Sequence, residues 1–195
     1  MDYRPVVLVF SVILASGCMG SSSESGKNVD FQELEDRSIE IKENITEVSS
    51  NGGGTTARLN FTDLSAEVNE SGNYLDLTVP SETDFYPGKF TLVDGESRSG
   101  IGDTIGFGYE SEDQPGVVLA KSEGGETVYR IEFRKIRVYQ RPYEMYKIQL
   151  EGPESAVERP RTLDMTMIST LREDVETTFE NRSAQVRTVN LKFSR

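Results

Sequence analysis

Few side chains in this sequence could perform covalent chemistry. The 195 residues include one cysteine, Cys18, and no histidine. The absence of histidine excludes Ser-His-Asp and Cys-His nucleophilic sites and every histidine-ligated metal site. A single cysteine also excludes internal disulfides and CxxC motifs. Enzymatic chemistry would therefore have to rest on carboxylates, lysine, tyrosine or serine.

Cys18 follows a short apolar stretch. Residues 6–15 read VVLVFSVILA, with Ser11 as the one polar residue. Such a stretch rises about 15 Å as a helix, about half the thickness of a bilayer core, and is too short for a comfortable membrane span. It has the length of the apolar region of a signal peptide, and Arg4 supplies positive charge before it. Ser16 and Gly17 then lead into the cysteine.

The four residues ending at Cys18, Ala-Ser-Gly-Cys, resemble the lipobox of bacterial and archaeal lipoproteins. The resemblance implies that a lipid is attached to Cys18, which becomes the first residue of the mature chain. It implies a signal peptide at 1–17, a lipid attachment and flexible tether at 18–27, and one extracellular domain at 28–195. The protein is then expected to be exported and anchored to the outer face of the cytoplasmic membrane. The alternative is a plain secretory signal with an incidental cysteine.

Basic and aromatic residues are interleaved between Tyr129 and Lys147, in an otherwise acidic chain of net charge -12. Arginine beside tyrosine is a common composition of protein interfaces. We expect this segment to bind an unknown surface protein or a glycan. Alternatively, it is an amphipathic hairpin whose arginines neutralise the chain's own carboxylates. Nucleic acid is disfavoured by the negative charge. The candidate partner-binding residues are Arg130, Arg134, Arg137, Tyr139, Arg141, Tyr143 and Tyr146.

Four Asn-x-Ser/Thr tripeptides mark candidate glycosylation sites at Asn44, Asn60, Asn69 and Asn181. This composition predicts about one or two such tripeptides by chance, so the excess is mild. It agrees with an exported glycoprotein, which among organisms with lipoboxes indicates an archaeon.

Two further stretches could hold a ligand but lack the required spacing. The glycines between Gly100 and Gly108 do not match the dinucleotide or P-loop patterns, so bulges within a strand are the preferred interpretation. The acidic residues at 110–113 lack the Asp-x-Asp-x-Asp-Gly loop of a calcium site. We therefore expect no cofactor and no metal.

The helices and strands that carry these residues can be predicted from the spacing of apolar residues. Apolar residues spaced by three and four predict an amphipathic helix over 28–50, ended by Gly52, Gly53 and Gly54. Period-two alternation then predicts eight or more short strands, with a turn at 70–73. Helical spacing returns near 171–181, predicting a short helix there, and a strand closes the chain at 186–193. We expect an α+β, mainly β domain: an N-terminal amphipathic helix packed on an antiparallel β-sandwich or bent sheet.

These features together predict a lipid-anchored binding or structural domain of the cell envelope and not an enzyme. The plan of helix followed by β-rich head loosely resembles archaeal pilin-like headpieces. It departs from them because the apolar run precedes Cys18 and would be removed with the signal peptide. The alternative is a secreted hydrolase working through paired carboxylates, although no pair stands out.

Overall fold

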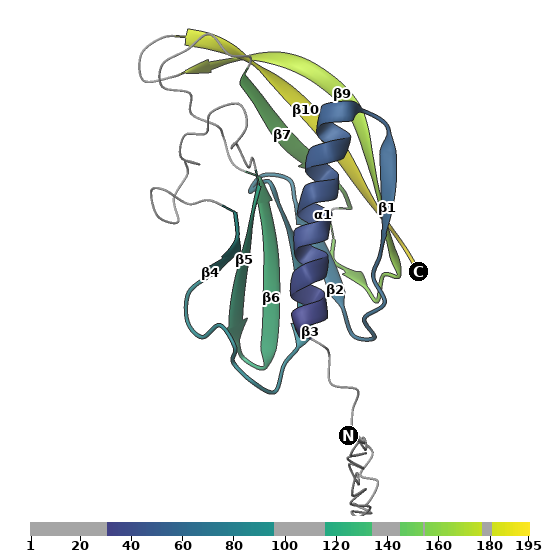
Figure 1. Ribbon diagram of the computed structural model, residues 1–195, viewed down its shortest axis with the longest axis vertical. Helices are drawn as coiled ribbons and strands as arrows, with labels where there is room; N and C mark the ends of the chain where they lie inside the picture. The colour runs from purple at the N-terminus through teal and green to yellow at the C-terminus, as the bar shows by residue number, and fades with distance from the viewer. Residues whose placement is uncertain (1–30, 96–115, 134–144, 154, 177–180) are drawn as a thin grey trace, which may run out of the picture.

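The structure is a computed structural model that describes residues 31–95, 116–133, 145–153, 155–176 and 181–195. It is mainly β, with one helix and two sheets, and the α+β prediction is confirmed at that level (Figure 1). The elements in chain order are α1 (Phe31–Asn51), β1 (Gly54–Arg58), β2 (Ser65–Asn69), β3 (Tyr74–Pro80), β4 (Thr91–Asp94), β5 (Gly116–Glu123), β6 (Glu126–Phe133), β7 (Met145–Glu151), β8 (Val157–Glu158), β9 (Thr162–Glu176) and β10 (Asn181–Ser194).

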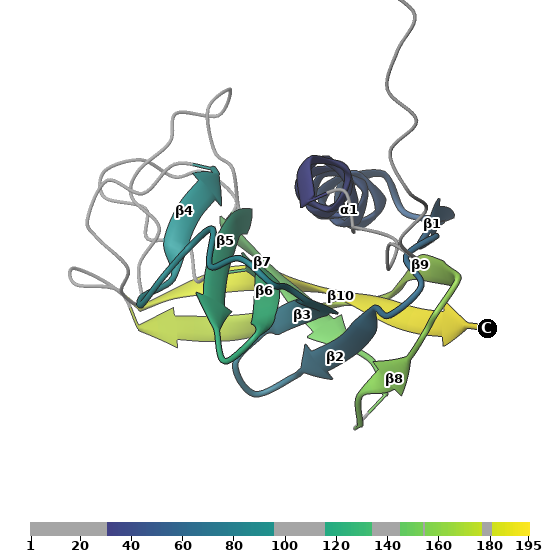
Figure 2. The same ribbon diagram turned by 90° about the horizontal axis from the view of Figure 1, so that it is seen from below.

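The strands form two sheets that share one hydrophobic core. The four-stranded sheet has the order β1-β9-β10-β7, and the six-stranded sheet has the order β4-β5-β6-β3-β2-β8. Helix α1 packs against β5 and β6 of the larger sheet and against β1, β9 and β10 of the smaller one. Figure 2 shows the helix on one side of the sheets, between β5 and β1. Strands β3 and β6 contribute alternate side chains to the core, as period two requires, whereas β5 is buried at five consecutive positions.

Helix α1 ends where the glycines predict. The N–H of Gly52 donates to the carbonyl of Val48 at 2.9 Å, and Gly52 and Gly53 both have positive φ. This is the left-handed helix ending that glycine adopts without steric cost. Within the described part of the chain, no helix is long and apolar enough to cross a membrane.

The description of α1 as an N-terminal amphipathic helix is wrong in two respects. The helix begins at Phe31, some way into the chain, and the side that it turns to the sheets is not purely apolar. Ser38, Lys42 and Ser49 are buried there beside aliphatic side chains. Each has a bonding partner: Ser38 and Ser49 donate to carbonyls of α1, and Lys42 pairs with Asp94 of β4.

The predicted short helix at 171–181 is also wrong. Residues 171–176 belong to β9, which pairs antiparallel with β10, so that Leu171 lies opposite Val186. Residues 177–180 lie outside the described part. Leu171 and Val175 are also compatible with a strand, and pairing with the long β10 outweighs the helical spacing. The sequence predicts an antiparallel sandwich or bent sheet, but β7 and β10 run parallel to each other.

Candidate functional site

Arg130, the one predicted partner-binding residue whose side chain the structure describes, lies on the outer face of the six-stranded sheet. The register aligns it with Asp76 of β3, and both of its bonds to that carboxylate are 2.8 Å long. The Asp76 carboxylate raises the pKa of the Arg130 guanidinium through these bonds. Arg130 therefore has a bidentate partner within its own chain.

Two aromatic rings complete the surroundings of Arg130. Its guanidinium carbon lies 3.6 Å from the centroid of the Tyr74 ring and 4.5 Å from that of Phe90. Such stacking holds the planar guanidinium in place and adds a cation–π attraction. This arrangement matches the alternative left open by the sequence, in which arginines neutralise neighbouring carboxylates.

The rest of the predicted patch cannot be placed around Arg130. Arg134, Arg137, Tyr139, Arg141 and Tyr143 lie outside the described residues. Tyr146 is part of β7, where the structure describes its backbone but not its side chain. Cys18 also lies outside the described part, which begins at residue 31.

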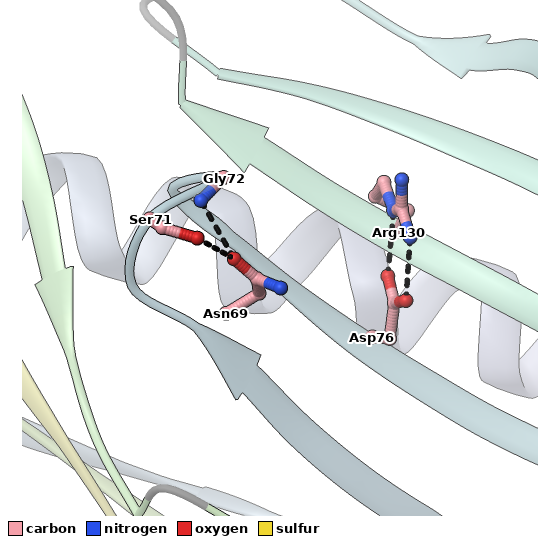
Figure 3. Close-up of polar contacts among 5 residues, drawn as sticks. All are labelled: Asn69, Ser71, Gly72, Asp76 and Arg130. Carbon is pink, nitrogen blue, oxygen red and sulfur yellow. Dashed lines mark hydrogen bonds and ion pairs between the residues drawn. The ribbon is translucent and has the colours of Figure 1, made fainter.

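The candidate glycosylation sites occupy different kinds of structure. Asn44 lies half-buried in the middle of α1, and Asn60 is exposed between β1 and β2. Asn69 ends β2 at the turn into β3, on the same face of the sheet as Arg130 (Figure 3). Asn181 begins β10, and its side chain is not described.

Sequence reasoning missed Asn73, the last residue of the predicted turn at 70–73. Its side chain is buried, and its amide group bonds both sheets. Nδ2 donates to the carbonyls of Phe133 at 2.6 Å and Ile148 at 2.7 Å, while Oδ1 accepts from the N–H of Leu150 at 2.8 Å. Asn73 has a φ of 57°, a conformation that asparagine tolerates better than most residues. An asparagine after glycine in a turn was the only signal in the sequence.

The start of α1 is fixed to β6 and to the segment between β3 and β4 by aromatic contacts that the sequence did not reveal. The ring centroids of Phe31 and Phe85 are 4.7 Å apart, and the Tyr129 hydroxyl donates to the carbonyl of Phe31 at 3.4 Å. One turn later, the Tyr86 hydroxyl donates to Glu35 at 2.5 Å. Burial raises the pKa of both tyrosines.

Several of the described carboxylates are paired with other side chains of the chain. No group of three or more Asp, Glu or Cys side chains in the described residues could hold a metal ion. Asp76, Asp94 and Glu35 face Arg130, Lys42 and a tyrosine hydroxyl, respectively.

Comparison with protein-family models, with curated proteins and with solved structures gave no match for this chain.

Proposed function

We propose that this chain is a lipid-anchored extracellular domain of the cell envelope that binds protein or glycan partners. In this proposal Cys18 carries the lipid, residues 18–27 form the tether, and residues 28–195 form the head. The sequence supplies the lipobox-like motif, and the structure supplies one supporting observation, the way in which the head begins.

That observation is the attachment of the first turns of α1 to the six-stranded sheet. Phe31 is the first described residue after the tether, and it contacts Phe85 through its ring and Tyr129 through its carbonyl. Glu35 and the buried Lys42 then connect the helix to Tyr86 and Asp94. A force arriving through the tether would therefore pass into the sheet instead of unwinding the helix. This arrangement suits a domain that is held at its N-terminal end.

A sheet edge favours a protein as the partner. In the described chain, β1 pairs with β9 as far as Thr166, and no described strand lies along that edge beyond Met167. Two large apolar side chains follow, Ile168 and Leu171, which are 52% and 61% exposed. An edge strand is a template for strand addition, and exposed apolar side chains add contact area.

The anchor is tested by Cys18→Ser in the source organism or a related host. We expect this variant to appear in the medium or to accumulate as unprocessed precursor, and to lose incorporation of a labelled lipid precursor. The matched control adds Ser21→Cys to the same variant, which returns a thiol outside the motif and should not restore anchoring. A Cys18→Ser chain that is cleaved normally and stays in the membrane would refute the proposal.

Partner binding is tested by crosslinking on intact cells, followed by identification of the crosslinked species. We expect Leu171→Asp to abolish the crosslinks to a protein, whereas Thr170→Asp, at an exposed neighbouring position, should retain them. Reversal of Arg134 and Arg137 to Glu tests the basic and aromatic segment separately. If none of these variants changes the crosslinked species, neither surface is the binding site.

A further inference from the structure

We infer that Asn69 is the preferred N-glycosylation site of the folded chain and that Asn44 is excluded from glycosylation by the fold. This inference rests on the proposed export of the protein, because glycan transfer to these tripeptides takes place on exported chains. The sequence contains four such tripeptides and gives no reason to prefer one of them as a glycosylation site. The structure distinguishes between them by the state of the asparagine amide and of the hydroxyl two residues later.

At Asn69 the amide and the hydroxyl already face each other. Oδ1 accepts a hydrogen bond from the Ser71 hydroxyl at 2.9 Å and another from the Gly72 N–H at 2.6 Å. Both donors lie on one side of the amide, and Figure 3 shows Nδ2 on the side away from them. Hydrogen bonds to an amide oxygen polarise the group and make its N–H protons more acidic. The nitrogen that would receive the sugar is thus activated and points away from the two donors, although Asn69 as a whole is half-buried.

The turn that carries Asn69 is held in this conformation by packing. A Cβ at Gly72 would overlap the ring of Tyr74, so a larger residue there would have to displace that ring or the turn. Asn73, the next residue, is bonded to Phe133, Ile148 and Leu150 of the neighbouring strands. The packing of residues 72 and 73 therefore fixes the conformation of the tripeptide at 69–71.

At Asn44 the same tripeptide chemistry is blocked. Like Asn69, the residue is half-buried, but it lies in the interior of α1, and its neighbour Ile45 is fully buried in the core. The hydroxyl of Thr46 donates to the carbonyl of Lys42 at 2.9 Å and is engaged with the helix backbone. A transferase could reach Asn44 only after the packed helix had opened locally.

Asn60 is intermediate between Asn44 and Asn69 in its suitability for glycosylation. It is exposed, but the adjacent Phe61 packs against the core, and the structure gives no hydrogen bond between Asn60 and the Thr62 hydroxyl. We therefore place Asn60 second to Asn69 among the tripeptides whose side chains are described.

The reaction requires a lipid-linked oligosaccharide phosphate as donor and a membrane transferase as catalyst. The bond between C1 of the first sugar and its phosphate oxygen breaks, and the lipid phosphate leaves with the electron pair. A bond forms between C1 and Nδ2 of Asn69, and one amide proton passes to a base of the transferase. No oxidant or reductant is needed.

The test uses the full chain, produced without glycan and purified in detergent. The folded chain and a urea-unfolded sample are each treated with a transferase and its lipid-linked donor, and glycopeptide mass spectrometry gives the occupancy of each site. We expect occupancy in the folded chain to be highest at Asn69 and at least about tenfold lower at Asn44, because local opening of a packed helix is rare. In the unfolded sample this difference should disappear.

The matched variant is Gly72→Ala, which leaves the Asn-x-Ser tripeptide intact but displaces the turn. We expect it to lower occupancy at Asn69 in the folded chain only, with a melting curve recorded to confirm that it folds. Equal occupancy at Asn44 and Asn69 in the folded chain, or an unmodified Asn69, would overturn the inference. A chain that accepts glycan at Asn69 in this assay yet fails the Cys18→Ser test would refute the anchoring proposal alone.

Discussion

Asn73 joins the two sheets through one side chain, and Asn73→Ala is the substitution that tests this most directly. The residue is 8% exposed and bonds the carbonyls of Phe133 and Ile148 and the N–H of Leu150. Phe133 belongs to β6 of the larger sheet, whereas Ile148 and Leu150 belong to β7 of the smaller one. Alanine at this position leaves three buried backbone groups without their partner.

The size of the effect follows from these contacts. Each buried group left without a partner costs about 1–3 kcal/mol, and we take the lower end of that range, about 1 kcal/mol, for each. Alanine at a φ of 57° adds about 1 kcal/mol, since the left-handed conformation is unfavourable for it. The expected loss is about 4 kcal/mol, a large part of the ~5–15 kcal/mol that stabilises most domains. For a chain of this size, it corresponds to a melting temperature lower by roughly 8–16 °C.

The assay is urea unfolding of the full chain, followed by far-UV circular dichroism because the protein has no tryptophan. Asn73→Gly is the matched control: it loses the same three hydrogen bonds but adopts positive φ freely, so it should be about 1 kcal/mol more stable than Asn73→Ala. Asn60→Ala, at an exposed position, should change the free energy of unfolding by less than about 0.5 kcal/mol. If Asn73→Ala loses less than about 1 kcal/mol, the bridging argument is wrong.

Substitutions at three further positions test other contacts. Lys42→Ala should lower the free energy of unfolding by about 2 kcal/mol in urea titrations, because it leaves Asp94 unpaired, and Lys42→Met should lose less since it keeps the packing of the stem. Arg130→Lys should cost about 1–2 kcal/mol by the same measurement, because lysine cannot make the bidentate pair and stacks less well; no loss would mean that the guanidinium geometry is unimportant. Burial raises the pKa of Tyr86 and Tyr129 in the folded state, so the unfolded chain loses these protons first as pH rises. Stability should therefore be fully present below about pH 10 and fall above it, and Tyr129→Phe should flatten that fall in denaturation curves recorded between about pH 8 and 11.

Much of the secondary structure could be predicted from local pattern. The alternation in β3, β6 and the first part of β9, the turn at 70–73 and the glycine ending of α1 all follow from side-chain spacing and turn chemistry. The segment after Leu171 could not be predicted in this way. Its apolar residues fit a helical period, but Val175 also suits a strand, and pairing with β10 decided between them.

The candidate site was harder to predict because its contacts are distant in sequence. Arg130 could be identified as a basic residue among aromatics, but its carboxylate partner Asp76 lies 54 residues away. Only the register between β3 and β6 places the two opposite each other. The same holds for Asn73, whose bonding partners are 60 to 77 residues distant.

By itself, the sequence of this protein determined which chemistry is excluded, that an apolar run precedes Cys18, and which asparagines stand in acceptor tripeptides. These are properties of residue types and their near neighbours, and they need no tertiary contact. The tertiary structure alone decided which carboxylate neutralises Arg130, that Asn73 joins the sheets, and that the amide of Asn69 faces its serine while Asn44 is held in a packed helix. Those outcomes depend on strand register and burial, which arise only when distant segments pair and exclude water.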